Sequence, residues 1–178
     1  QLLSGVASET MPRDDGYRFL VLGRWLERAE MTCRLLAVRY KALGGTREME
    51  FHWWAGLLSS VSAFEAYLKE HRASVDPARV LEFLLLSPGF PRSILFCLRA
   101  TEQQLDALIP AEQRVSAQRL LGRVRAGVEY CDVEDLVVEG LGEFLDHLQV
   151  DIWKVGEAID AHFFRHGADL DLHAYMST

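Results

Sequence analysis

The stretch "FLVLGRWLERAEMTCRLLAVRY", residues 19–40, places apolar residues at helical spacing around a cluster of charges. At 100° per residue, one side of this helix gathers a conventional core face. That face consists of Leu22, Leu26, Ala29, Cys33, Leu36, Ala37 and Tyr40. Asp14-Asp15-Gly16 supplies an aspartate N-cap, and Gly44-Gly45 supplies a C-terminal stop. The sequence therefore predicts one long helix that ends near Leu43.

Helical periodicity also dominates the rest of the chain, and strand alternation is nearly absent. The predicted helices beyond the first cover residues 50–71, 77–86, 91–108, 111–130 and 132–166. Asp76-Pro77, Pro91 and the capping-box-like Asp132-x-x-Asp135 mark three of the starts. The last helix could bend at Gly140, Gly142 or Gly156, and Gly167 would close it. The prediction is an all-α, single-domain bundle of about six helices.

Length and composition agree with one domain over residues 1–178. Within it we expect an irregular start over residues 1–13 and a tail over residues 168–178. Because the first residue is Gln1 rather than methionine, we expect that this chain is part of a longer protein or lacks its start.

The net charge of −7 leaves no basic stripe for nucleic acid or for an anionic membrane. No apolar run approaches the length of a membrane span. Cys33, Cys97 and Cys131 lie far apart without a C-x-x-C pair, so they are predicted to be small core residues of a cytoplasmic protein.

The charges of the first helix lie opposite its core face. That second face consists of Leu20, Arg24, Glu27, Arg28, Met31, Leu35 and Val38. A fully solvated face would not carry so many apolar residues, so the charges are predicted to be semi-buried. Arg24 and Arg28 repel each other, and Glu27 cannot satisfy both guanidinium groups. Glu30 and Arg34 have the favourable i, i+4 spacing.

Further acceptors must therefore come from outside this helix. The candidates are carboxylates on other predicted helices, Glu65, Glu129, Asp132 or Glu143, or else the phosphate or carboxylate of a ligand. Two interpretations stay open. In the first, the charges form a structural ion-pair network against a neighbouring helix or a partner subunit. In the second, they line a polar pocket that holds an anionic group.

Arg92 and Ser93 are predicted to lie in the first turn of the fourth helix, where unpaired backbone N–H groups favour an anion. An arginine at that positive helix end favours a nearby anion or acidic partner residue. The alternative is a capped surface turn.

Metal and cofactor sites find little support in the sequence. His162 and His166 have metal-compatible spacing, but they fall in the last turn, where histidines also suit the negative helix end. The Glu-x-x-His pairs of di-iron bundles, nucleophile elbows and phosphate-cradling glycine loops are missing. We therefore expect no metal and no cofactor.

Several ordered blocks resemble the bacterial alpha-E domain family. They are "DDGYRFLVLGRWLERAEMTCRLLAVRY", "WAGLLSSVSAFEAY", "VLEFLLLSPGFPRSILFCLRATE" and "GLGEFLDHLQ". In that family a G-R-x-L-E-R-A-E/D segment normally occurs twice in a longer protein, and this chain is similar to the C-terminal half. By position, the motif falls on Gly23, Arg24, Glu27, Arg28 and Glu30, and a proline-arginine-serine block falls on Pro91, Arg92 and Ser93.

The resemblance implies a domain of unknown function whose genes lie beside those of ATP-grasp ligases and transglutaminase-like peptidases. It suggests an accessory or binding component of a bacterial peptide-ligation or peptide-modification system, more in keeping with a non-enzyme. Such a component would meet an ATP-grasp ligase or a transglutaminase-like partner, or an anionic peptide or nucleotide. One alternative is an enzyme that uses Glu27 as acid or base, with Arg24 and Arg28 holding its substrate. Another is a purely structural domain that pairs with a second copy or with the other half of the full-length protein.

Overall fold

The computed structural model describes Gly5 and residues 9–42, 51–71, 75–110, 113, 115–138 and 140–165. Within these ranges the regular elements are eight α-helices, so the predicted all-α class is confirmed, although about six helices were expected. They are α2 (Asp15–Ala42), α3 (Phe51–Ser60), α4 (Phe64–His71), α5 (Pro77–Leu86), α6 (Ile94–Leu108), α7 (Ser116–Glu129), α8 (Val133–Val138) and α9 (Leu141–Phe163).

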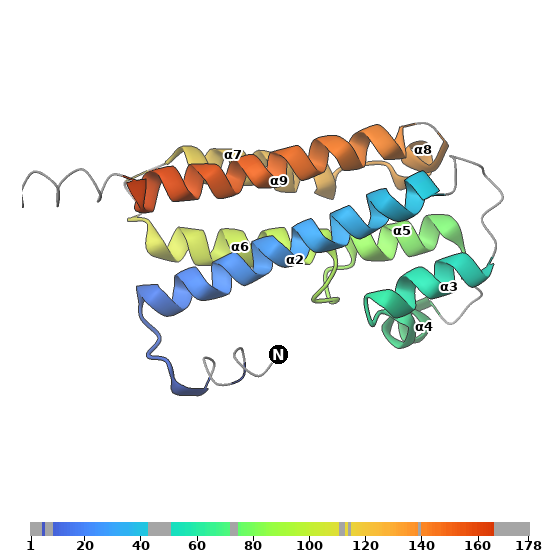
Figure 1. Ribbon diagram of the computed structural model, residues 1–178, viewed down its shortest axis with the longest axis horizontal. Helices are drawn as coiled ribbons and strands as arrows, with labels where there is room; N and C mark the ends of the chain where they lie inside the picture. Colours follow the sequence, from blue (N-terminus) through green and yellow to red (C-terminus); the bar gives the residue numbers. More distant parts are fainter. Residues whose placement is uncertain are drawn as a thin grey trace, which may run out of the picture.

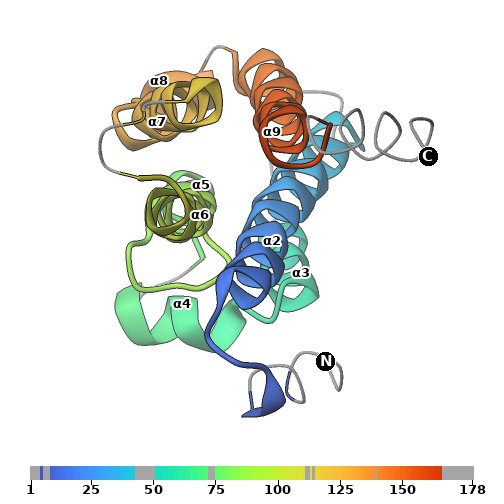
Figure 2. The same cartoon turned by 90° about the vertical axis from the view of Figure 1, so that its left-hand side faces the viewer.

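The four long helices form the body of the molecule. Helix α2 packs against α6 and α9, and α7 packs against the same two helices, so the four stand at the corners of a bundle seen end-on (Figure 2). Helices α5 and α6 lie end to end along one line (Figure 1). The short helices α3 and α4 pack beside the end of the bundle at which α5 lies.

Helix α2 buries the core face that its periodicity predicts. Two residues of this face, Leu26 and Tyr40, are half-buried. The other five are at most 4% exposed: Leu22, Ala29, Cys33, Leu36 and Ala37. The start of the helix is capped as expected, because the carboxylate of Asp14 accepts a hydrogen bond from the backbone N–H of Tyr17 at 3.1 Å.

Two glycines of α9 leave room for side chains of α2. A Cβ atom at Gly142 would lie 3.2 Å from the ring of Tyr40, and one at Gly156 would lie 3.6 Å from Leu26. Neither glycine interrupts the helix, because both lie inside α9. The third candidate, Gly140, does interrupt the predicted helix. It adopts a left-handed conformation with φ of +104° and lies between α8 and α9.

The second predicted helix is wrong as a single element, because the structure divides it into α3 and α4. Ser62 adopts a left-handed conformation with φ of +54°. The N–H of Ala63 donates to the carbonyl oxygen of Leu58 at 2.8 Å, and the N–H of Ser62 donates to that of Ser59 at 3.0 Å. These two hydrogen bonds form a Schellman motif, which ends α3. Glycine usually marks the position in a sequence, and here a serine occupies it.

Two of the predicted helix starts are confirmed. Asp76 caps α5, with its carboxylate accepting from the N–H of Arg79 at 3.1 Å and Pro77 at the first helical position. Asp132 caps α8 by accepting from the N–H groups of Glu134 and Asp135.

Other boundaries differ from the sequence predictions. Helix α6 begins at Ile94 instead of Pro91, and α7 begins at Ser116 instead of Ala111. Helix α9 ends at Phe163. The predicted end near His166 and the predicted tail 168–178 lie outside the described residues, as does most of the irregular start.

The same substitution should have opposite effects at two glycines. Gly127 lies inside α7 with no atom within 4 Å of an added Cβ, so Gly127→Ala should raise the free energy of unfolding by about 0.5–1 kcal/mol. Gly140→Ala forces a side chain into the left-handed region and should lower it by about 1–2 kcal/mol. Urea unfolding followed by circular dichroism measures both values, and shifts of the same sign would contradict the assigned backbone conformations.

Candidate functional site

A shallow depression lies where α2 meets the turn before α6. Arg24, Glu27, Arg28 and Met31 contribute from α2, Arg92 contributes from the turn, and the volume is about 190 Å³. The structure thus brings four of the predicted site residues, three of them arginines, to one surface.

Hydrogen bonds to the backbone attach this turn to α2. The hydroxyl of Thr32 donates to the carbonyl oxygen of Arg92 at 3.0 Å. Nη1 of Arg28 donates to the carbonyl oxygen of Pro91 at 3.4 Å, and the Cys97 thiol donates to the same oxygen at 3.5 Å. The turn that carries Arg92 is therefore held against α2 by hydrogen bonds to its backbone rather than by an ion pair.

Ser93 supports the turn from inside the protein. It is fully buried, its hydroxyl donates to the carbonyl oxygen of Ser87 at 2.5 Å, and it accepts from the N–H of Phe96 at 3.1 Å. It is the N-cap of α6, one residue before the helix, and not a first-turn residue. The prediction that Arg92 and Ser93 lie in the first turn of this helix is therefore wrong, because Ser93 is the residue that caps it.

The three arginines have no acidic partner in the part of the chain that the structure describes. No carboxylate there lies within 4.0 Å of the side-chain nitrogens of Arg24, Arg28 or Arg92. Arg24, Arg28 and Arg92 are half-buried, and Glu27 is exposed. The guanidinium carbon of Arg28 lies 4.9 Å from the ring centroid of Trp25, a cation–π distance that orients the side chain.

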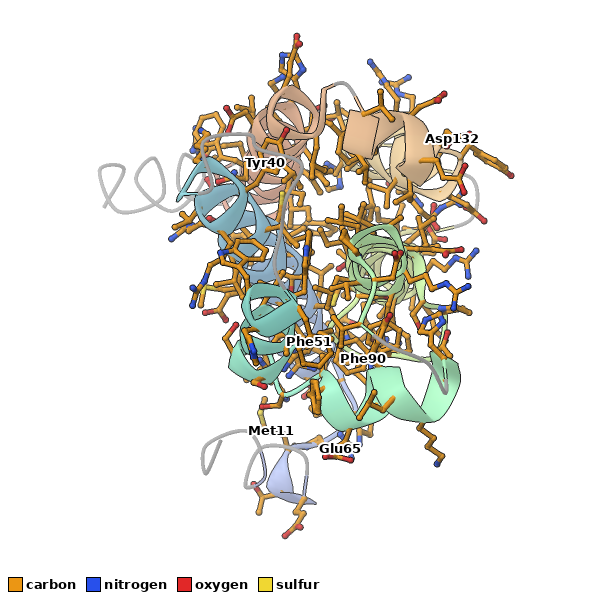
Figure 3. All side chains as sticks on the ribbon, turned by 90° about the vertical axis from the view of Figure 1, so that its right-hand side faces the viewer. Met11, Tyr40, Phe51, Glu65, Phe90 and Asp132 are labelled. Carbon is orange, nitrogen blue, oxygen red and sulfur yellow. The ribbon has the colours of Figure 1, made fainter. Side chains whose placement is uncertain are left out.

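The carboxylates predicted to compensate these charges lie elsewhere. Glu129 pairs with Arg99 at 2.6 Å and also with Arg125, and Asp132 caps α8. Figure 3 shows Glu65 and Asp132 at opposite sides of the molecule. Glu143 is exposed on α9. The prediction of an intramolecular ion-pair network from these four residues is wrong for the described residues.

Glu30 and Arg34 do form the predicted i, i+4 ion pair with each other, and neither lines the depression. The apolar residues on the charged face are only partly covered. Leu20 and Leu35 are half-buried, whereas Met31 is 58% exposed and Val38 is 59% exposed. The second face of α2 is thus semi-buried around its arginines and open at these two side chains.

Thr32 and Trp25 are contributors that the sequence did not single out. Thr32 is 3% exposed, and Trp25 stacks edge-on against Phe96 with ring centroids 5.5 Å apart. No local pattern marks either residue, because the partner of each lies on α6 or in the turn before it.

The remaining chemical candidates have ordinary structural roles. Among the described residues, no group of three His, Cys, Asp or Glu side chains is placed to hold a metal ion. Asp160 pairs with Arg165 at 2.6 Å, and His166 lies outside the described residues. Across the described ranges, no helix is long and apolar enough to cross a membrane.

The cysteines are poor nucleophiles in this fold. Burial, together with the nearby charges of Asp146 and Glu30, raises the pKa of Cys33 to about 12. Burial also raises the pKa of Cys97 to about 12, against the opposing effect of Arg28 and Arg92. Both thiols therefore stay protonated at neutral pH, as expected of core residues.

Fold and site together define an all-α bundle with a basic depression on its first long helix. The sequence profile of the Alpha-E family, a predicted alpha-helical domain with a conserved ER motif, matches residues 1–164. The chain therefore belongs to the Alpha-E family. Its one Glu-Arg dipeptide is Glu27-Arg28, so the motif lies in the depression. Comparisons with curated proteins and with solved structures gave no match.

Thr32→Val should lower the free energy of unfolding by about 1–3 kcal/mol, because it leaves the carbonyl oxygen of Arg92 without its buried donor. Urea unfolding gives the value. Thr32→Ser is the control, because it keeps the hydroxyl. If the valine and serine variants are equally stable, this hydrogen bond does not hold the turn.

Thiol titration should separate the three cysteines. Cys131 is half-buried, and Cys33 and Cys97 are fully buried. In the folded protein at neutral pH, Ellman's reagent should modify Cys131 first and the other two only after addition of denaturant. Burial raises the pKa of Cys131 as well, so its rate should increase as the pH rises. Cys131→Ser should abolish the native-state reaction, and rapid modification of a second thiol would contradict the assigned burial.

Proposed function

We propose that this domain is a non-catalytic binding component that recognises an anionic group through Arg24, Arg28 and Arg92. The observation that carries the proposal is that three guanidinium groups line one depression without a carboxylate in salt-bridge range among the described residues. One exposed carboxylate, Glu27, faces three positive charges there.

A bound anion would offset the repulsion among the three arginines. Neighbouring arginines repel one another, and a phosphate or carboxylate can accept paired hydrogen bonds from their guanidinium forks. The backbone contacts of Arg28 and of the Arg92 turn reduce the ordering that binding requires. The depression is small and open, which suits the charged terminus of a larger molecule.

The resemblance to the alpha-E family implies a role in a bacterial peptide-ligation or peptide-modification system, and we add that role to the proposal. ATP-grasp ligases activate carboxylates with ATP, so their substrates and products carry the groups that arginines bind. We propose that this cytoplasmic domain presents or retains an anionic peptide or nucleotide for an ATP-grasp or transglutaminase-like partner. Nothing in the depression beyond Glu27 supplies an acid or base, which favours binding over catalysis.

Calorimetric titration with tripolyphosphate, ATP and an acidic peptide tests the proposal. Arg28→Ala should weaken binding about tenfold or more, as loss of a charge-assisted hydrogen bond does. Arg24→Ala and Arg92→Ala should act in the same direction. Glu27→Gln should strengthen binding, because it removes the negative charge from the site.

Arg39→Ala is the matched control, because Arg39 is exposed on the same helix and does not line the depression. If Arg39→Ala weakens binding as much as Arg28→Ala, the attraction is a general charge effect and the proposal fails. If the variants change the molar mass in solution instead of ligand affinity, the arginines serve assembly. Loss of pathway activity in Glu27→Gln with intact binding would indicate catalysis.

A further inference from the structure

A second open site lies in the groove between α7 and α9. Its volume is about 260 Å³, larger than that of the arginine-lined depression. The wall is formed by five apolar side chains from the two helices: Leu120, Val124, Val128, Phe144 and Leu148. Val128 and Leu148 belong to the core, at 1% and 6% exposure, so the groove extends from the surface to the core.

A glycine keeps this groove open. Gly127 lines it from the middle of α7, and a Cβ atom added there would meet nothing within 4 Å. Glycine is unfavourable inside a helix relative to alanine, and none of the described residues crowds the position. The space beside Gly127 is therefore available to a ligand.

The rim of the groove is basic although the chain has a net charge of −7. Arg123 is exposed, and no carboxylate of the described residues lies within 4.0 Å of its side-chain nitrogens. Lys154 pairs with Asp151 at 2.9 Å, which neutralises both. His147 is the fourth polar residue of the rim. Arg123 thus leaves one uncompensated positive charge beside an apolar wall.

We propose that the groove between α7 and α9 binds a small carboxylate with an apolar body, its ring or branched chain beside Gly127 and its carboxylate on Arg123. An apolar wall with few polar groups is the usual make-up of a small-molecule site. The volume lies just below the about 300–1,000 Å³ of such sites, which fits a ligand with one ring. The arginine-lined depression is built from α2 and the turn before α6, so the two sites are independent.

Titration of the full chain with 3-phenylpropanoate, followed by NMR of the methyl groups, tests the proposal. Saturable shifts should concentrate on Leu120, Val124 and Leu148. Gly127→Leu fills the groove and should weaken binding more than about tenfold, because it displaces the apolar body of the probe. Arg123→Gln, and the neutral analogue 3-phenylpropanamide with the parent protein, should each weaken binding about threefold to tenfold.

Two variants serve as controls. Gly56→Leu makes the same change at an exposed helical glycine that also has open space, but away from the groove. Arg119→Gln removes a charge one turn earlier on α7, outside the groove. Both should bind the probe like the parent. Gly127→Ala adds only a methyl group to the groove and stabilises the helix, so it tests the groove even if the leucine variant unfolds. It should weaken binding about twofold or more.

Absence of saturable shifts in the folded parent overturns the proposal, as do shifts that concentrate away from the groove. Unchanged binding in Gly127→Ala and Gly127→Leu also overturns it. If the parent protein binds 3-phenylpropanamide as tightly as 3-phenylpropanoate, the carboxylate is not recognised, and the proposal that the ligand is a carboxylate is overturned. Arg28→Ala should leave this binding unchanged, so a failure here is separate from a failure at the arginine-lined depression.

Discussion

The packing of α2 against α6 and α9 is the interaction on which the rest of the structure depends. Three of the buried positions on α2 hold small residues instead of bulky ones: Ala29, Cys33 and Ala37. On α9, Gly142 and Gly156 leave room for Tyr40 and Leu26. Small residues allow close approach, and close approach gives dense packing along the length of α2.

Because α2 is fixed on its inner side, its outer side can hold charges without unfolding the bundle. Thr32 and Arg28 bind carbonyl oxygens of the turn before α6, and this attaches Arg92 beside Arg24. Backbone hydrogen bonds therefore hold the turn against α2, and the three arginines, which form no ion pair among the described residues, keep their charges free to bind another molecule. A network of internal ion pairs would have used up the same groups.

One site lies where α2 meets the turn before α6 and the other lies between α7 and α9, and they differ in chemistry. The seam of α2 with the turn before α6 is basic and shallow, whereas the seam of α7 with α9 is apolar with Arg123 on its rim. Each places an uncompensated positive charge on a chain of net charge −7. Apart from Arg92, helices hold the residues that line both sites, so little ordering of the backbone is required when a ligand binds.

The sequence by itself determined the features that depend on near neighbours: the helical class, the core face of α2, and the caps at Asp14, Asp76 and Asp132. Helical period and capping act within a few residues, so they can be read locally. Only the tertiary structure decided that Ser62 ends α3, that Ser93 caps α6 from the core, and that Arg92 joins the arginines of α2. It also decided that Glu129 and Asp132 have other partners, because the distance between charges is set by how helices remote in sequence pack.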